Sequence, residues 1–267
     1  MMQNNFKYYV FDLDGTLLNS KKNISLKTLK VLEDIKDKIV LCTGRHWEEV
    51  VGYIDLLNLG KKNYIIYEDG FYLSYASGEE ICRSEAFESK EVERIIDSIE
   101  SNRYCVFTEC VDYLIEKNII LRLWRMMRNK SSRLYIIRSI KNVKRNNMQN
   151  FIKINIPNVN ANKLKELESK YTLHYLSNGD LDILKAQCNK FSAIKNLCEC
   201  TNTSLDEVLY FGDSINDVEC FENLRYTIAM GNAEKIIKNM AYKVTNTNDN
   251  DGVAEFLNHD INFMIDG

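Results

Sequence analysis

The sequence predicts an α/β protein in which helices cover a parallel sheet, with a smaller α+β domain inserted into that fold. Three observations predict it. Short apolar runs alternate with amphipathic helical segments from residue 8 to residue 70, and the alternation resumes from residue 187 onward. Between these parts, short strands and a hairpin pattern replace the alternation. The chain has 267 residues, of which 45% are hydrophobic, so it can form one large domain or two small ones.

The first part of the main domain alternates strands and helices. The expected elements are strands over residues 8–11, 39–42 and 64–67, a helix from 26 to about 36, a helix around 47–54, and a hairpin over 71–84. Each strand is an apolar run, and each helix carries apolar residues three or four positions apart. Ser25 can cap the first helix. This order favours a Rossmann-like parallel sheet covered by helices.

The middle of the chain has a different pattern. The expected elements are helices over 90–101, 119–128 and 161–170, and strands near 104–108, 113–116, 151–156, 173–176 and 181–184. Pro157 ends the third of these strands, and Asn178-Gly179 between the last two is a strong β-hairpin signal. These residues therefore form a separate α+β unit.

The alternation of the main domain resumes after the insertion. The expected elements are helices over 191–200, 218–224, 233–240 and about 252–257, and strands over 208–211 and 226–230. We therefore assign residues 1–83 and 187–267 to the main domain and residues 84–186 to the inserted domain.

Composition indicates a cytoplasmic protein. The net charge is −3, and the eight cysteines include no C-x-x-C pair, which favours free thiols over a zinc site or disulfides. The N-terminal residues contain no apolar signal segment, and no stretch approaches 18 apolar residues. We therefore expect no membrane partner.

Two carboxylates, Asp12 and Asp14, follow the first strand and precede a Gly-Thr turn. Residues i and i+2 of a strand point the same way, so these side chains would repel each other at a buried strand end. A divalent cation between them would remove the repulsion, and so would a proton kept on one of them for acid/base work. An isolated D-x-D-G can also be an ordinary strand end with a turn.

Two further strands end in polar groups, which are Thr43-Gly44 and the set Asp213, Asn216 and Asp217. The carboxyl ends of parallel strands lie on one edge of the sheet, where such folds bind ligands. Carboxylates from two strands suit Mg²⁺, and a hydroxyl and a glycine N–H suit phosphate oxygens. Lys190 adds a mobile positive charge. Together these groups favour phosphoryl transfer.

The chain resembles the haloacid dehalogenase superfamily. The segments 12–17, 42–45, Lys190 and 212–217 (DLDGTL, CTGR, K and GDSIND) are similar to its four motifs, in order. The insertion resembles the large cap of the Cof-like (IIB) phosphatases, and segments 229–233 and 251–254 resemble late core segments of that subfamily.

The resemblance implies a role for each motif residue. Asp12 would be the nucleophile that forms an aspartyl-phosphate, and Asp14 the general acid and then the base for water. The implied metal ligands are Asp12, Asp213, the main-chain carbonyl of Asp14, and Asp217 directly or through water. The implied phosphate-binding residues are Thr43, Gly44, Lys190 and Asn216.

The resemblance therefore predicts a Mg²⁺-dependent phosphatase for a small phosphorylated metabolite, such as a sugar phosphate, nucleotide or cofactor phosphate. It predicts a monomer or homodimer without a nucleic-acid partner. A phosphomutase or phosphotransferase on the same fold is the alternative among enzymes, and a non-catalytic phosphometabolite-binding protein is the alternative outside them.

The chain departs from the family pattern in two places. The family usually has Asn-Gly after its third strand, where this chain has Asp69-Gly70. It also usually has glycine on both sides of the third-motif lysine, where this chain has Gln187 and Phe191. We expect these changes to affect substrate fit rather than chemistry. The Asp69 carboxylate either lies near the anion site or caps a turn.

The predicted insertion contains an unusual basic stretch. Residues 117–165 include 13 Lys and Arg and no Asp or Glu, whereas the remaining residues include 22 Lys and Arg against 38 Asp and Glu. The stretch is either a solvated basic face or a surface that attracts a multiply anionic substrate. Nucleic-acid binding is a third interpretation, which the acidic chain and the absence of a known binding motif disfavour.

Overall fold

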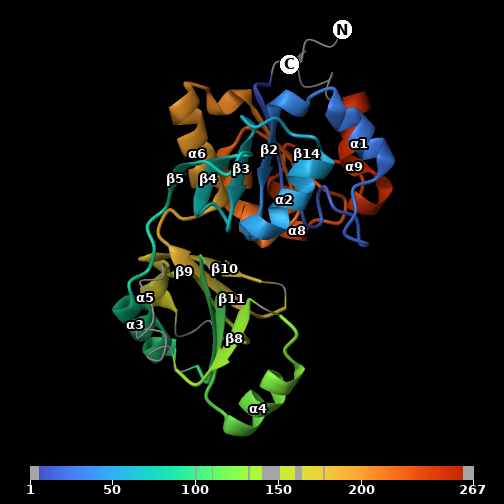
Figure 1. Ribbon diagram of the computed structural model, residues 1–267. Coiled ribbons are helices and arrows are strands. Elements are labelled where there is room, and N and C mark those ends of the chain that lie inside the picture. Colours follow the sequence, from blue (N-terminus) through green and yellow to red (C-terminus); the bar gives the residue numbers. More distant parts are fainter. Residues whose placement is uncertain are drawn as a thin grey trace. The chain divides into compact units, whose positions relative to one another are not determined.

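The chain folds into two compact units. The computed structural model describes residues 6–99, 101–109, 111–131, 133–139, 151–159, 164–176 and 178–260. One unit, the core, comprises residues 1–83 and 189–267, and the other, the cap, comprises residues 84–188 (Figure 1). The chain therefore returns to the core after Cys188, two residues later than the expected boundary.

An eight-stranded sheet lies at the centre of the core. Its order is β14 (Lys243–Val244), β13 (Tyr226–Ala229), β12 (Val208–Gly212), β1 (Tyr8–Phe11), β2 (Ile39–Cys42), β3 (Tyr64–Tyr67), β4 (Tyr72–Tyr75) and β5 (Glu80–Arg83). The strands from β14 to β3 are parallel, and β4 and β5 add an antiparallel hairpin at the edge. The predicted α/β fold with a parallel sheet is thus confirmed.

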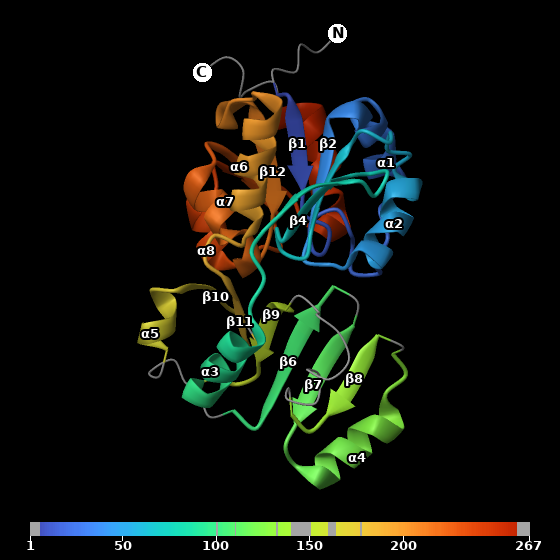
Figure 2. The same ribbon diagram turned by 60° about the vertical axis from the view of Figure 1, so that its left-hand side comes forward.

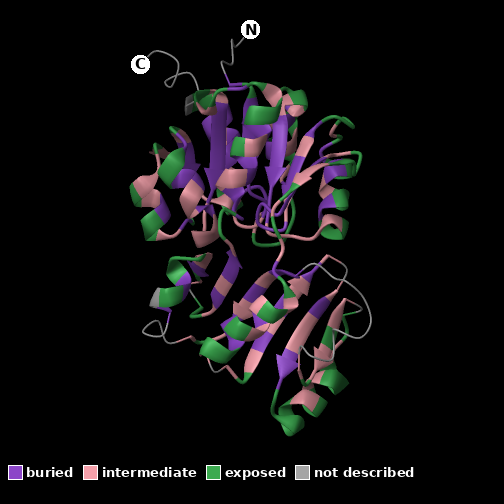
Figure 3. Ribbon diagram, turned by 90° about the vertical axis from the view of Figure 1, so that its left-hand side faces the viewer, coloured by how far each residue is buried: buried purple, intermediate pink, exposed green. Residues whose placement is uncertain are grey.

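Helices cover both faces of the core sheet (Figure 2). They are α1 (Leu26–Glu33), α2 (Trp47–Leu56), α6 (Lys190–Thr201), α7 (Val218–Asn223), α8 (Lys235–Met240) and α9 (Gly252–Glu255). Tyr9 and Phe11 pack in the apolar cluster that includes residues of α1, α2 and α9. Tyr8 and Val10 pack in the opposite cluster, with residues of α6, α7 and α8. Because both faces are covered, β1 and β12 are buried along their whole length (Figure 3).

The register of the central strands brings three chain segments to one edge of the sheet. Phe11 is paired with Leu41 of β2 on one side and with Phe211 of β12 on the other. These strands are parallel, so the residues that follow them leave the sheet at the same edge.

The cap contains a six-stranded sheet with helices. In chain order its elements are α3 (Ser89–Ile99), β6 (Arg103–Thr108), β7 (Asp112–Glu116), α4 (Ile119–Arg128), β8 (Leu134–Ile137), β9 (Phe151–Ile156), α5 (Lys165–Glu168), β10 (Tyr171–Tyr175) and β11 (Leu181–Lys185). The sheet order is β10-β11-β9-β6-β7-β8. All neighbours are antiparallel except β7 and β8, which α4 connects.

Strand β8 is not among the elements expected from the sequence. The expected helix over 161–170 is shorter in the structure, where α5 begins at Lys165; residues 161–163 lie outside the described part of the chain. The buried face of α3 packs against the cap strands through Val92, Ile95 and Ile96. Among the described residues, none of the helices combines the length and the apolar character that crossing a bilayer would require.

Candidate active site

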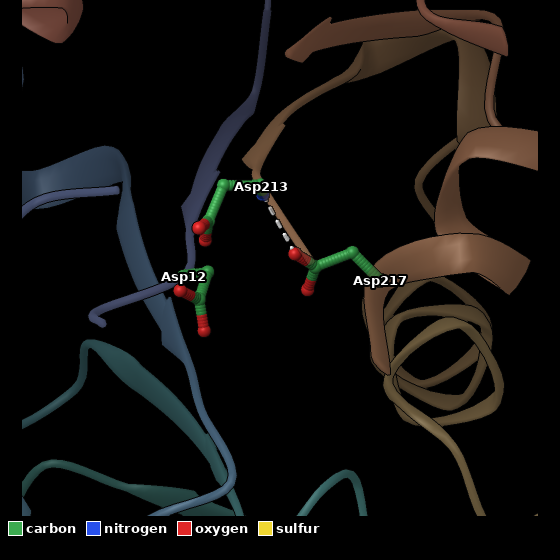
Figure 4. Close-up of side chains that lie close together, drawn as sticks. All are labelled: Asp12, Asp213 and Asp217. Atoms are coloured by element: carbon green, nitrogen blue, oxygen red, sulfur yellow. Dashed lines mark hydrogen bonds between the residues drawn. The ribbon is translucent and has the colours of Figure 1, made fainter. Parts of the chain in front are cut away.

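Three carboxylates meet at the carboxyl edge of the core sheet (Figure 4). Asp12 follows β1, Asp213 follows β12, and Asp217 ends the 3₁₀ turn Ile215–Asp217. Each offers an oxygen atom that lies within 4.8 Å of the others. Gly15 allows this approach, because it has a φ of +84° and a Cβ there would lie 2.2 Å from Asp213 Oδ2.

Lys190, the first residue of α6, lies between two of these carboxylates. Its Nζ donates hydrogen bonds to Asp12 Oδ1 at 2.7 Å and to Asp217 Oδ1 at 2.6 Å. Burial alone would lower the pKa of this amine, but the two carboxylates outweigh burial and raise its pKa well above the usual value. Lys190 is therefore charged although its side chain is only 1% exposed.

The charges of this buried group do not balance without a cation. Three carboxylates face one ammonium group, which leaves two negative charges in excess when all are ionised. Burial, followed by the charge of Asp217, raises the pKa of Asp213 to about 7. The donor set and the excess charge fit a divalent cation that prefers oxygen ligands, such as Mg²⁺.

Asp217 lies in the cluster, but its oxygens are already engaged. Oδ1 accepts hydrogen bonds from Lys190 and from the Tyr210 hydroxyl, the latter at 2.6 Å. Oδ2 accepts from the backbone N–H groups of Asp213 at 2.8 Å and Ser214 at 3.0 Å. Four donors therefore hold this carboxylate in place, and the arrangement suits orientation of Lys190 and of the Asp213 loop.

The Tyr210 hydroxyl allows a test of this network, because Tyr9 on β1 offers a matched control. Both side chains are fully buried, but the Tyr9 hydroxyl has no hydrogen-bond partner among the described residues. We expect Tyr210→Phe to lower the free energy of unfolding by about 1.5–3 kcal/mol, as for a lost hydrogen bond to a charged group. We expect Tyr9→Phe to be neutral or stabilising.

Urea denaturation of both variants measures this difference. Tyr210→Phe should also lower kcat, because Asp217, which holds Lys190, then loses one of its four hydrogen-bond donors. Equal stability changes in the two variants would show that the Tyr210 hydroxyl does not support the carboxylate network.

The Asp14 side chain pairs with Arg45. Arg45 donates from Nε to Oδ2 at 2.5 Å and from Nη2 to Oδ1 at 2.7 Å, and Lys22 Nζ lies 2.6 Å from Oδ1. Burial would raise the pKa of Asp14, but the hydrogen bonds from Arg45 and Lys22 outweigh burial and lower it to about 2. In this arrangement Asp14 is a carboxylate, so donating a proton requires that it separate from Arg45.

The Arg45–Asp14 pair predicts a pH-dependent contribution to stability. The pKa of Asp14 is depressed in the folded protein, so the pair stabilises the fold above about pH 4 and loses that effect as the pH falls toward 2. We expect Arg45→Gln to cost about 1 kcal/mol at pH 5, a value reduced for the partial exposure of Asp14, and less at pH 3.

Denaturation at both pH values checks this prediction, with Arg83→Gln as the control because Arg83 forms an exposed pair with Glu80. A loss for Arg45→Gln that is the same at pH 5 and pH 3 would contradict it.

The expected phosphate-binding residues lie at the same edge. Thr43 is buried directly after β2, and its Oγ1 accepts a hydrogen bond from the Arg45 N–H. The Asn216 amide donates from Nδ2 to Asp69 Oδ1 at 3.0 Å. A Cβ on Gly44 would lie 2.5 Å from the same Asp69 oxygen, so only glycine fits there without displacing that side chain.

Asp69 therefore does more than end a turn. Glu68, Asp69 and Gly70 all have positive φ angles, which confirms a turn, but the Asp69 side chain is buried between Gly44 and Asn216. The sequence interpretation favoured the turn. The signal for a place in the site was an acidic residue two positions after the parallel strand β3, at the edge that carries the other polar groups.

Three further residues of the site, Arg45, Tyr210 and Asn232, are not expected from the sequence. The Asn232 amide donates to the Gly15 carbonyl at 2.8 Å and to Asp213 Oδ2 at 3.3 Å. Asn232 thereby joins the first-motif loop to the Asp213 loop. Its signal in the sequence was its place in segment 229–233, which resembles a late core segment of the Cof-like subfamily.

Comparison with known sequences identifies the family. The sequence profile described as haloacid dehalogenase-like hydrolase matches residues 9–257. The chain belongs to the haloacid dehalogenase-like hydrolases. The predicted family is thus confirmed. The fold of this haloacid dehalogenase-like hydrolase brings the motif residues Asp12, Lys190, Asp213 and Asp217 together.

Relatives of this haloacid dehalogenase-like hydrolase match it over almost the full length. Phosphatase YwpJ of Bacillus subtilis is 28% identical over 95% of this chain and 99% of the relative. The 5-amino-6-(5-phospho-D-ribitylamino)uracil phosphatase YcsE of the same organism is 25% identical over 95% of each. The solved structure of a haloacid dehalogenase-like hydrolase from B. subtilis is 26% identical, covers 95% of this chain and 99% of that one, and superposes with a TM-score of 0.76.

Proposed function

We propose that the chain is a Mg²⁺-dependent phosphatase that hydrolyses a small phosphorylated metabolite through an aspartyl-phosphate on Asp12. The buried cluster of Asp12, Asp213 and Lys190, with its excess of negative charge, carries this proposal. Membership of a hydrolase family and the phosphatase names of the relatives support it.

In this proposal Asp12 and Asp213, with the main-chain carbonyl of Asp14, hold the cation, and Asp217 supports the site through Lys190. Bound Mg²⁺ would offset the negative charge of the phosphoryl oxygens and of the carboxylates. The side chain of Lys190 and the groups at Thr43, Gly44 and Asn216 bind the phosphoryl oxygens.

The chemistry consists of two displacements at phosphorus. In the first, an oxygen of Asp12 forms a bond to phosphorus while the bond to the ester oxygen breaks, and Asp14 gives its proton to that leaving oxygen. In the second, water attacks phosphorus, Asp14 accepts the proton of the water, and the bond to Asp12 breaks to release inorganic phosphate. The first step requires Asp14 to leave Arg45 and acquire a proton.

A panel of phosphorylated sugars, nucleotides and cofactors, assayed with and without Mg²⁺, tests the proposal. It includes the ribityl phosphate for which the relative YcsE is named. We expect Mg²⁺-dependent release of inorganic phosphate from at least one compound. A phosphorylated isomer as the product would instead indicate a phosphomutase. Tight binding without turnover would indicate a binding protein.

A further inference from the structure

Helix α4 of the cap exposes its apolar side chains. Every apolar residue of this ten-residue helix is exposed, including Ile119, Ile120, Leu123 and Trp124, and Met127 reaches 79%. These five residues recur at helical spacing and form one face. The least exposed residues of the helix are Arg122 and Arg125. The usual arrangement of an amphipathic helix is therefore reversed.

A buried acid explains this orientation. Glu116, at the end of β7, is 2% exposed and lies just before the helix. Arg125 Nε is 3.5 Å from Glu116 Oε2, and Arg122 donates from Nη1 to the Glu116 carbonyl oxygen at 3.2 Å. Because both arginines turn toward Glu116, the apolar face must turn away from the cap. Contiguous exposed apolar surface of this kind marks an interaction site.

The charges around this face indicate its partner. Lys117 precedes the helix, Arg128 is its last residue, and Lys130 lies two positions after it. All three side chains are exposed. They belong to the stretch from 117 to 165 that contains 13 basic and no acidic residues. A partner should thus accept apolar side chains and present many negative charges, two properties that an anionic lipid surface combines.

We propose that the face formed by Ile119, Ile120, Leu123, Trp124 and Met127 binds to an anionic lipid surface. The helix would lie in the plane of the interface, with its apolar side chains among the acyl chains and the flanking cations at the head groups. Such binding needs no spanning helix, so it is compatible with the short apolar runs of this chain, but it departs from the expectation of no membrane partner. It is independent of the proposed phosphatase activity.

Two other occupants fit less well. A second copy would bring a second basic stretch against the first, and a helix about 15 Å long offers much less than the ~800 Å² per partner of a stable interface. The second alternative occupant is the segment 140–150 of this chain, which lies outside the described residues. It contains Lys141, Lys144 and Arg145 and no acidic residue, so it does not supply the negative charge that the flanking cations of α4 call for.

Tryptophan fluorescence tests the proposal directly, because the chain has only two tryptophans. In a Trp47→Phe protein, Trp124 is the sole reporter. We expect vesicles that contain phosphatidylglycerol to shift its emission to shorter wavelength and to sediment the protein at least tenfold better than phosphatidylcholine vesicles. Because the attraction is electrostatic, both effects should weaken at high salt.

Matched variants assign the binding to this face. We expect Ile120→Asp combined with Met127→Asp to abolish sedimentation with the vesicles. Leu26→Asp should leave sedimentation unchanged, because Leu26 is a similarly exposed apolar residue on the surface of the other unit. If the double variant fails to fold, quenching of Trp124 by brominated lipid gives the same information.

Three results would overturn the proposal. One is equal, weak binding to both lipids, which would leave an acidic protein as the partner to seek. The second is an emission shift that follows protein concentration without vesicles, which would indicate a second copy. The third is an emission shift of Trp124 when beryllofluoride, a mimic of the phosphoryl group, is added without vesicles. Such a shift would indicate that the core covers the helix.

Discussion

Asp12→Asn is expected to abolish turnover while the protein stays folded. An amide cannot replace the carboxylate oxygen as the nucleophile, and loss of a nucleophile typically lowers kcat by several orders of magnitude, here at least about 10⁴-fold. Stability should not fall. Burial, together with the charges of Asp213 and Asp217, raises the pKa of Asp12 well above its usual value despite Lys190, so a neutral side chain relieves repulsion in the metal-free protein.

Release of inorganic phosphate measures turnover, and thermal unfolding measures stability. Binding of beryllofluoride, which mimics a phosphoryl group on an aspartate, reports whether the Asp12 side chain can accept that group. Asp55→Asn is the matched control, because Asp55 lies on the exposed surface of α2 in the same unit. Turnover of Asp12→Asn near the wild-type rate would exclude the covalent mechanism. If Asp12→Asn is unfolded as well as inactive, Asp14→Asn replaces it in the test, because Asp14 lies outside the buried cluster. We expect Asp14→Asn to stay folded and to slow hydrolysis of the aspartyl-phosphate, because the base for water is lost.

Mg²⁺ is expected to restore activity after chelation and to raise the melting temperature more at pH 8 than at pH 5.5. The pKa of Asp213, about 7, lies above its ordinary value, so the metal-free protein binds a proton there from about pH 4 to 7 and loses stability as the pH rises through 7. Below pH 7 the cation must displace this proton. A hundredfold excess over Kd should raise the melting temperature by roughly 5–10 °C at pH 8.

Differential scanning fluorimetry with and without Mg²⁺ across this pH range checks the prediction. Asp213→Asn should remove both the Mg²⁺ effect and its pH dependence, whereas Asp206→Asn, an exposed aspartate near the start of β12, should change neither. Full activity in excess chelator, or a Mg²⁺ effect that is identical at both pH values, would contradict the assignment of Asp213 as a ligand.

The sequence by itself determined the architecture of the core and the edge at which its polar groups lie. The continuous apolar runs at residues 8–11, 39–42 and 208–211 indicate strands buried on both faces, as parallel strands covered by helices are. That topology brings the residues after each strand to a common edge, so the order of the elements along the chain is enough to group Asp12, Thr43 and Asp213.

The tertiary structure decided which charges pair. Local patterns depend on neighbouring residues, whereas the contact of Lys190 with Asp12 joins residues 178 positions apart, and Asn216 meets Asp69 across 147 positions. No spacing rule predicts that Tyr210 completes the hydrogen bonds of Asp217, or that Asp14 turns to Arg45.

The direction of α4 is a similar case. The sequence predicted a helix over 119–128, but not which face it turns to the cap. Hydrophobic burial would turn the apolar face inward. The buried carboxylate of Glu116 attracts Arg125 instead, and Arg122 donates to the Glu116 carbonyl oxygen beside it. An acid removed from water requires a compensating charge, and this requirement appears only once the strands of the cap are assembled around it.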